Sequence, residues 1–332
     1  MEQRLLGSTG QTVSALGLGL MGMSAFYGPV DRKECIRTIH QALDDGITIL
    51  DTGDFYGMGH NELLLGEALQ GRKREEAFVS VKFGAQRSPD GVFIGYDARP
   101  QALKSFLSYT LVRTGLDYID LYQPARVDPA VPIEDTVGAI AEMIEKGYVR
   151  HVGLSEAGSE TLRRASAVHP VAWLQIEYSI LSRGIEDSIM PTARELDIAI
   201  NPYGVLSRGL LSGTWSADRS AGGGGLRTHM PRFTGDNLEH NLDLVEKLRR
   251  IANEKRITVA QLAIAWVLAQ GKDIIPLIGA RSRGQLNDAL AALDVSLTSE
   301  DLARIDAAVP KGSAAGDRYA PDQMKSLDSE KG

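Results

Sequence analysis

Eight short apolar segments alternate with helical segments along the chain, and this repetition restricts the fold more than any other feature of the sequence. The apolar segments have the length of buried strands, and the segments between them have the length of ordinary helices. The expected strands are residues 15–21, 47–51, 77–82, 118–123, 149–155, 172–178, 198–203 and 274–278. The expected helices are residues 31–45, 61–70, 100–114, 133–146, 159–168, 186–196, 238–254, 258–270, 285–293 and 299–308.

Regular alternation of strands and helices indicates parallel β-α-β units. Because a doubly wound sheet usually has fewer strands, eight near-regular units predict a closed (β/α)8 TIM barrel in the α/β class. Residues 4–13 contain two short extended pieces around a turn of Gly, Ser and Thr, which predicts an N-terminal β-hairpin. The helices beyond the eight units are expected to be auxiliary.

The 332 residues suit one barrel, so residues 1–332 are expected to form a single domain. The polar tail, residues 311–332, is expected to be poorly ordered apart from contacts made by Tyr319 and Met324. A formal net charge of −7 provides no basic surface for nucleic acid. Cys35, the single cysteine, cannot form an intrachain disulfide and suits a reducing compartment. No signal peptide or run of about 20 apolar residues is present, so we expect a cytoplasmic protein without a membrane partner.

Two neighbouring strands end on residues of opposite charge, with a tyrosine on the loop between them. Residues 47–51 end on Asp51, residues 77–82 end on Lys82, and Tyr56 lies between. A carboxylate at the end of a buried strand costs free energy unless a partner compensates it. A lysine ammonium would lower the tyrosine pKa from about 10, and Asp51 would keep that lysine charged. This arrangement predicts Tyr56 as a general acid for carbonyl reduction by hydride transfer, although a structural ion pair beside an incidental tyrosine is the alternative.

Polar residues also end the strands that follow, and the carboxyl ends of barrel strands carry the active site. The six consecutive strand ends are Asp51, Lys82, Gln123, Ser155, Gln175 and Tyr203.

A glycine pattern near the N-terminus imitates a dinucleotide-binding motif. Residues 17–22 match G-x-G-x-x-G, but the Rossmann version requires a helix to begin inside the motif. Here a loop containing Gly28 and Pro29 precedes the helix expected from Asp31. We therefore interpret these glycines as part of a barrel strand whose following loop approaches the pocket.

Several motifs, in order along the chain, resemble the aldo-keto reductase superfamily. They are Leu50-Asp51-Thr52-Gly53-Asp54-Phe55-Tyr56-Gly57, Val81-Lys82, Gly153-Leu154-Ser155, Gln175-Ile176-Glu177-Tyr178-Ser179, Leu206-Ser207-Arg208-Gly209-Leu210-Leu211-Ser212-Gly213 and Ile275-Pro276-Leu277-Ile278-Gly279-Ala280-Arg281. The resemblance extends from about residue 3 to beyond residue 310. It implies a (β/α)8 barrel and a nicotinamide dinucleotide, usually NADPH, bound without a Rossmann domain.

The resemblance also implies roles for matching residues. Tyr56 resembles the proton donor, with Lys82 and Asp51 as the pair that tunes it. Ser155 and Gln175 match residues that bind the nicotinamide carboxamide, and Tyr203 matches the aromatic residue that stacks on the ring. The loop along the pyrophosphate contains Leu206, Arg208, Gly209, Leu211 and Gly213. The start of the last barrel helix, with Gly279, Ala280 and Arg281, suits a phosphate, and Gln285 and Asp288 match positions beside the adenosine. Substrate contacts are expected from Met21, Phe26, Tyr27 and Phe55, which suit aldehydes.

Three positions depart from the pattern of the family. Ala125 replaces the usual histidine, so one hydrogen-bond donor for the carbonyl oxygen is missing, a loss that can cost ~3–4 kcal/mol of transition-state stabilisation. Tyr56 alone, another group or a water could compensate, or the preferred substrate could be unusual. His60 is the nearest alternative in sequence, but a histidine on a loop before a helix is more often only solvated. Glu156 and Ala289 stand where many relatives have asparagine, which weakens the expectation for cofactor affinity.

Arg281 and Arg283 favour a 2′-phosphate and therefore NADP(H) over NAD(H). The glycine run at residues 222–225 is either a linker or a hinge for a lid, and its place after the pyrophosphate loop favours the lid. The histidines show no metal-binding spacing, so no metal is expected. The leading hypothesis is a reductase of small carbonyl compounds. An NAD(P)-dependent dehydrogenase of a sugar or a pyridoxine-like alcohol and a non-catalytic cofactor-binding regulatory subunit are the alternatives.

Overall fold

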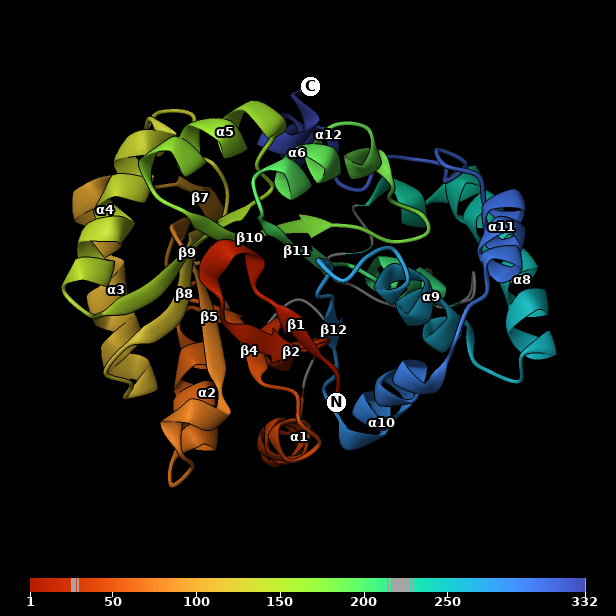
Figure 1. Ribbon diagram of the computed structural model, residues 1–332, viewed down its shortest axis with the longest axis horizontal. Coiled ribbons are helices and arrows are strands. Elements are labelled where there is room, and N and C mark those ends of the chain that lie inside the picture. Colours follow the sequence, from red (N-terminus) through yellow and green to blue (C-terminus); the bar gives the residue numbers. More distant parts are fainter. Residues whose placement is uncertain (25–27, 29, 214, 216–226, 228–229, 332) are drawn as a thin grey trace.

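Eight parallel strands surround a common axis, with helices packed outside them (Figure 1). The computed structural model describes residues 1–24, 28, 30–213, 215, 227 and 230–331. The barrel strands are β3 (Gly17–Gly19), β4 (Ile49–Gly53), β5 (Phe78–Phe83), β8 (Ile119–Pro124), β9 (Val149–Ser155), β10 (Val171–Glu177), β11 (Ala199–Tyr203) and β12 (Leu277–Gly279). Strand β12 pairs with β3, and a parallel bridge between Ile200 and Ile274 brings the chain before β12 against β11. The predicted (β/α)8 TIM barrel is confirmed.

Helices pack around the outside of the strands, and all of the described ones except α12, which was not predicted, agree with the expected helices to within a few residues. They are α1 (Arg32–Asp44), α2 (His60–Leu69), α3 (Pro100–Thr114), α4 (Ile133–Glu145), α5 (Ser159–Val168), α6 (Ile189–Glu195), α8 (Gly235–Glu254), α9 (Val259–Leu268), α10 (Arg283–Leu290), α11 (Ser299–Ala308) and α12 (Pro321–Lys325). Capping side chains explain where two of these helices begin. Asp31 caps α1 by accepting from the Lys33 amide, and Thr258 forms a capping box with Gln261 at α9.

The predicted N-terminal hairpin is also confirmed, and it covers the amino-terminal end of the barrel. It consists of β1 (Gln3–Leu5) and β2 (Thr12–Ser14). Leu6 and Val13 pack with Trp173 and other side chains from the strands in one buried cluster. The Arg4 guanidinium donates to the carbonyl oxygens of Gly271 and Ile274. Because the hairpin fills this end, a binding site can form only at the carboxyl ends of the strands.

One pair of strands was not predicted. Strands β6 (Ala85–Arg87) and β7 (Phe93–Tyr96) form an antiparallel hairpin between β5 and α3. These strands are short and only partly buried, so they lack the long apolar run that marks the barrel strands. The predicted helix at 186–196 also begins later, at Ile189, after a single 3-10 turn.

The expectation of a poorly ordered tail is wrong for the described residues. The tail forms α12, and the side chains of Arg318, Tyr319 and Leu327 are buried. Met324 packs against the main hydrophobic core, as expected. The composition of the tail is polar, but Arg318, Tyr319 and Ser329 bond to residues of the barrel.

Some predictions fall outside the described residues. They concern Phe26, Tyr27 and the glycine run at 222–225. Among the helices that the structure describes, none combines the length and the apolar character needed to cross a bilayer.

Candidate active site

A buried polar layer crosses the barrel just inside the carboxyl ends of its strands. Asp51 on β4 accepts hydrogen bonds from the Ser80 hydroxyl at 3.0 Å and from the Gln175 amide at 2.9 Å. Gln175 also donates to Asn201 at 2.9 Å, and Gln123 donates to Ser80 at 3.1 Å. Four of the six predicted strand ends, Asp51, Lys82, Gln123 and Gln175, therefore share one hydrogen-bond network, whereas Ser155 and Tyr203 have other partners. Asn201 belongs to this layer but was not predicted, because its position two residues before Tyr203 looks like strand interior.

Asp51 and Lys82 form a buried ion pair, each with only 3% of its surface exposed. Burial lowers the pKa of Lys82 below its usual value, the Asp51 carboxylate opposes this shift, and the nearby positive charge of Arg126 adds to it. The expectation that Asp51 keeps this lysine charged is thus correct in direction, but desolvation outweighs it. The Lys82 proton is therefore held less tightly than that of an ordinary lysine.

Tyr56 lies directly beside this ion pair. The Lys82 ammonium is 5.3 Å from the centroid of the Tyr56 ring, and only 6% of Tyr56 is exposed. Its backbone amide donates to the Gly53 carbonyl at 3.0 Å, so a tight turn follows β4. Asn61 holds the loop from the other side by donating to the Leu20 carbonyl at 2.9 Å. These contacts fix the loop that carries the tyrosine against the ends of β4 and β5.

Phe55 packs edge-on against Tyr56 and lines a separate cavity. The two ring centroids are 4.7 Å apart at 70°. The cavity of about 300 Å³ lies between α3 and the β6–β7 hairpin, with Asp54 also on its wall. Burial, followed by the neighbouring Glu62 carboxylate, raises the pKa of Asp54 to about 7. The structure thus places Phe55 at the edge of the Tyr56 site, where it also faces this second space.

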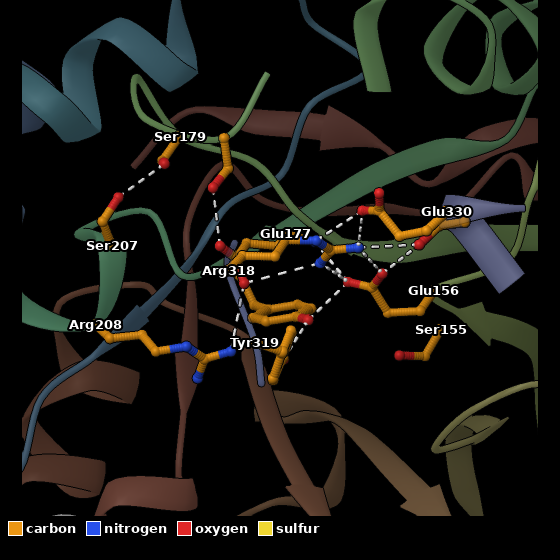
Figure 2. A network of polar contacts seen from close by, with 12 residues as sticks. Ser155, Glu156, Glu177, Ser179, Ser207, Arg208, Arg318, Tyr319 and Glu330 are labelled. Atoms are coloured by element: carbon orange, nitrogen blue, oxygen red, sulfur yellow. Dashed lines mark hydrogen bonds and ion pairs between the residues drawn. The ribbon is translucent and has the colours of Figure 1, made fainter. Parts of the chain in front are cut away.

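Glu156 occupies the position at which many relatives have asparagine, and its carboxylate is fully buried. It forms an ion pair with Arg318 of the tail (Figure 2), and the Tyr203 hydroxyl donates to it at 2.6 Å. Although burial favours the neutral acid, the guanidinium of Arg318 outweighs it and lowers the pKa of Glu156. Sequence reasoning missed Arg318, because no spacing pattern connects a tail residue to the end of β9.

Three further side chains surround Tyr203. The Tyr319 hydroxyl lies 2.7 Å from the Tyr203 hydroxyl. The Arg126 guanidinium donates to the Tyr319 hydroxyl at 3.3 Å. Arg126 also reaches the Ser155 hydroxyl at 3.4 Å. Burial, followed by the Glu156 charge, raises the pKa of Tyr203 well above its usual value, so this phenol stays protonated.

The expected pyrophosphate loop has a backbone that few sequences adopt. Ser207, Arg208 and Gly209 have φ values of 45°, 55° and 107°, and Gly213 has 72°. A Cβ on Gly209 would come within 3.1 Å of Arg227 Nη2, so glycine lets this guanidinium lie against the loop. Leu206 is partly buried and Leu211 is fully buried, so both contribute packing.

At the start of α10, the expected phosphate-binding residues have protein partners. Gln285 accepts from the Arg281 amide at 2.8 Å, and Asp288 accepts from Gln261 at 2.8 Å. Arg283 pairs with Glu34 of α1 at 3.1 Å, so it shares its charge with a carboxylate. Gly279 is exposed and Ala280 is buried, which leaves the backbone before the helix open to solvent at Gly279.

The remaining candidates lie apart from the ion pair. His60 Nδ1 is 2.8 Å from the Ser24 hydroxyl and its Nε2 is 3.1 Å from Arg32, so this histidine bridges the loop after β3 and α1. Met21 is partly buried after β3. Ala125 is 2% exposed at the end of β8. Within the described part of the chain, no group of three or more His, Cys, Asp or Glu residues is arranged to hold a metal ion.

A TIM barrel with a buried carboxylate, a lysine and a tyrosine at the carboxyl ends of adjacent strands defines a barrel enzyme, since this fold carries its active sites at that end. Comparison with known proteins makes the class specific. The sequence model of the Aldo/keto reductase family matches residues 15–310. A probable aldo-keto reductase 1 from Glycine max is 42% identical over 317 residues, which cover 95% of this chain and 90% of that protein.

Solved structures agree with this assignment. The glycerol dehydrogenase AKR11B4 from Gluconobacter oxydans superposes with a TM-score of 0.84 at 29% identity, covering 92% of this chain and 94% of that one. The holo form of AKR11C1 from Bacillus halodurans gives 0.78 at 27% identity, covering 98% and 99%. The chain therefore belongs to the aldo/keto reductase family and is an oxidoreductase. The family generally binds a nicotinamide cofactor and acts on small-molecule carbonyl compounds.

The residues present fit such a cofactor. The amides of Ser207 and Gly209 donate within the turn, to the carbonyl oxygens of Gly204 and Leu206, so the positive charge that suits a phosphate comes from Arg208 and Arg227. Gly209 lets the Arg227 guanidinium lie against this loop, which a side chain at that position would crowd. At the other end of the site, the Ser155 hydroxyl and the Tyr203 ring provide a donor and an aromatic surface.

Proposed function

We propose that this protein is an NADPH-dependent reductase that converts aldehydes and ketones to alcohols, with Tyr56 as the general acid. The observation that carries the proposal is the Asp51–Lys82 ion pair, buried beside the Tyr56 ring. A lysine whose pKa is lowered by burial is suited to returning a proton to a tyrosine after each turnover.

In the proposed reaction the cofactor supplies the hydride, and two side chains of this protein, Tyr56 and Lys82, supply and replace the proton. Bound NADPH supplies the hydride that reduces the carbonyl carbon. Tyr56 donates its hydroxyl proton to the carbonyl oxygen as negative charge develops there, which gives the alcohol. The Lys82 ammonium then protonates the phenolate, and Asp51 orients the ammonium and limits its loss of charge. The site excludes water because these three side chains are buried.

For the cofactor, we propose the residues that the family resemblance implies. Ser155 and Gln175 would orient the nicotinamide and Tyr203 would stack on it, while the loop from Leu206 to Gly213 would follow the pyrophosphate. The segment from Gly279 to Arg281, with Gln285 and Asp288, would hold the adenosine end. Arg281 and Arg283 support NADP(H) over NAD(H), although the pairing of Arg283 with Glu34 must loosen for a 2′-phosphate to use it. Met21 and Phe55 are the described candidates for substrate contact.

Alcohol oxidation by the same site is the second candidate. The superposition on a glycerol dehydrogenase favours it, because a hydride-transfer site works in both directions. Cofactor preference separates the two directions, since reductases in cells generally use NADPH and dehydrogenases generally use NAD⁺.

The test is oxidation of NADPH and NADH with a panel of aldehydes, by the natural chain and by Tyr56→Phe. We expect turnover with NADPH that falls by about 10²–10⁴-fold in Tyr56→Phe while cofactor binding persists. Tyr148→Phe, which changes an exposed tyrosine, is the matched control and should leave turnover unchanged. Unaltered turnover in Tyr56→Phe would refute the mechanism, and absence of binding to either cofactor would refute the proposed function.

A further inference from the structure

The carboxylate of Glu156 is fully occupied by contacts within the protein. Its Oε1 accepts from the Glu177 amide at 3.1 Å, from the Tyr203 hydroxyl at 2.6 Å and from Arg318 Nη1 at 2.8 Å. Its Oε2 accepts from Arg318 Nη2 and from the Ser329 hydroxyl, both at 2.5 Å. An ionised carboxylate can only accept hydrogen bonds. Glu156 therefore has no donor to offer a cofactor, and its acceptor sites are already used.

These contacts fasten the tail to the loop between β9 and α5. The Ser329 amide donates to the Glu156 carbonyl at 3.0 Å, and the Gly158 amide donates to Asp328 at 2.8 Å. A Cβ on Gly158 would lie 3.0 Å from the Asp328 carbonyl oxygen, so the two backbones approach closely. Arg318 is 9% exposed and also pairs with Glu330 at 2.8 Å on its outer side. The tail is thus held at a defined position by several independent bonds.

The residue next to this anchor points its polar group into the candidate cofactor site. The Tyr319 hydroxyl lies 2.7 Å from the Tyr203 hydroxyl and 3.3 Å from Arg126, which itself reaches Ser155. Figure 2 shows Tyr319 among Glu156, Arg318 and Arg208. The Arg208 guanidinium lies 4.6 Å from the centroid of the Tyr319 ring. Ser155, Tyr203 and Arg208 are three of the residues proposed above for the cofactor, so Tyr319 lies among them although it comes from the tail.

We propose that Tyr319 is a further cofactor-binding residue, whose hydroxyl turns its proton from the Tyr203 oxygen to the nicotinamide carboxamide and so replaces the amide that Glu156 lacks. The inference rests on the proposed function, because it assumes a nicotinamide cofactor. Glu156 and Arg318 are positioning residues that act through Tyr319. Arg126 donates to the phenol oxygen, and a hydroxyl that accepts from a cation becomes a stronger donor. A hydroxyl both donates and accepts, so it can serve an amide group as an asparagine would.

The experiment compares two ligands on Tyr319→Phe, which removes only the hydroxyl. One ligand is NADP⁺, and the other is 2′-phospho-ADP-ribose, which has the same phosphates and adenosine but no nicotinamide. Titration calorimetry should show NADP⁺ binding weakened by about 2- to 12-fold, the effect of one lost hydrogen bond, and unchanged binding of 2′-phospho-ADP-ribose. Tyr148→Phe is the matched control and should bind both ligands as the natural chain does.

Arg318→Lys tests the positioning role, because lysine keeps the charge but cannot form the two parallel bonds to Glu156. It should weaken NADP⁺ binding selectively, and the double variant with Tyr319→Phe should bind NADP⁺ no more weakly than the weaker of the two single variants. Glu330→Gln touches the same guanidinium from its exposed side and should have no effect on either ligand.

Other outcomes would overturn the proposal. Equal NADP⁺ affinity in Tyr319→Phe would show that the hydroxyl makes no bond to the cofactor, and tighter binding would show that Tyr319 occupies the place of the nicotinamide. Equal loss for both ligands would indicate a general structural effect. These results concern the variant only. If the natural chain itself bound neither ligand, the proposed function would fail, and this inference with it.

Discussion

Two buried clusters in this molecule have the same components and differ in how they are assembled. The strand-end cluster is Asp51, Lys82 and Tyr56, and the tail-anchor cluster is Glu156, Arg318 and Tyr319. In each, a carboxylate that is 3% exposed or less pairs with a buried cation beside a tyrosine. The first joins neighbouring strands of the barrel, whereas the second joins the end of β9 to a residue 162 positions later.

The two clusters differ in their cation, which is a lysine in the strand-end cluster and an arginine in the tail-anchor cluster. Burial lowers the pKa of Lys82, so this side chain gives up its proton more readily than an ordinary lysine does. Burial also disfavours the charge of Arg318, but Glu156 outweighs it and raises the pKa of the guanidinium, which therefore keeps its proton. A lysine pair is suited to chemistry and an arginine pair is suited to holding a segment in place. Whether a buried ion pair can transfer a proton or only hold a segment in place therefore depends on whether its cation is lysine or arginine.

The largest effect should come from breaking the strand-end cluster. Lys82→Met leaves Asp51 buried without its cation, which should lower the free energy of unfolding by about 3–5 kcal/mol and abolish measurable turnover. Adding Asp51→Asn should recover much of the stability and none of the turnover. Urea denaturation and an NADPH oxidation assay measure the two quantities. A single variant as stable as the natural chain would show that Asp51 is not charged in the folded protein.

Breaking the tail-anchor cluster should cost less stability. Arg318→Met removes the cation, but Glu156 keeps hydrogen bonds from Tyr203, Ser329 and the Glu177 amide, so we expect a loss of about 2–3 kcal/mol. The loss should be local. Hydrogen exchange should accelerate in residues 316–331 and remain slow in the barrel strands, unlike the global effect at Lys82. Uniform acceleration across the barrel would contradict a separate anchor.

A third carboxylate, Asp54, has no cation bonded to its side chain among the described contacts. Its effect on stability should therefore change with pH in the opposite sense to that of the ion-paired Glu156. Its pKa is about 7 in the folded protein against an ordinary value of 3.8, so the folded state binds more protons between these values. Stability should therefore fall as pH rises from about 4 to 7. Asp54→Asn removes this dependence and should be more stable than the natural chain by about 1–3 kcal/mol at pH 8, with little difference at pH 4.5.

Urea denaturation at the two pH values measures this difference. Asp322→Asn, on the exposed side of the tail, provides the control and should show no change with pH relative to the natural chain. A constant effect of Asp54→Asn at both pH values would mean that the carboxyl of Asp54 does not titrate in this range.

The smallest effect should come from an exposed ion pair with good geometry. Arg163 donates two parallel hydrogen bonds to Glu195, at 2.7 and 2.6 Å, yet both side chains are largely exposed to solvent. Water screens this pair and compensates either partner when the other is removed. Arg163→Ala should therefore leave the unfolding temperature unchanged within error and should not alter cofactor binding. A clear fall in the unfolding temperature would show that hydrogen-bond geometry contributes more to the stability of an ion pair than its burial does.

The sequence predicted the strand-end cluster well because periodicity and strand ends are local properties. Asp51 and Lys82 end apolar runs, and parallel neighbours must bring such ends together. The barrel order follows from the same regularity. The β6–β7 hairpin was missed, since three or four partly exposed residues carry no clear alternation.

The tail-anchor cluster could not be predicted, and the reason is physical. Its composition resembles that of a disordered end, and only the burial of Glu156 makes a partner for it necessary. Glu156 was noted as a departure from the family, but the sequence does not reveal which of the many arginines would meet it. Tyr319 was expected to contact the barrel, whereas its place beside Tyr203 emerged only in three dimensions.

The pairing of the first barrel strand with the last one affects how the chain is made. Gly17 of β3 lies opposite Leu277 of β12, so the ring of strands cannot close until nearly all of the chain has left the ribosome. At about 5–20 residues per second, the β3 edge waits on the order of ten seconds or more for its partner. Arg318 and Tyr319 emerge later still. A nascent chain therefore holds an unprotected strand edge for most of its synthesis, and it completes the candidate cofactor site last.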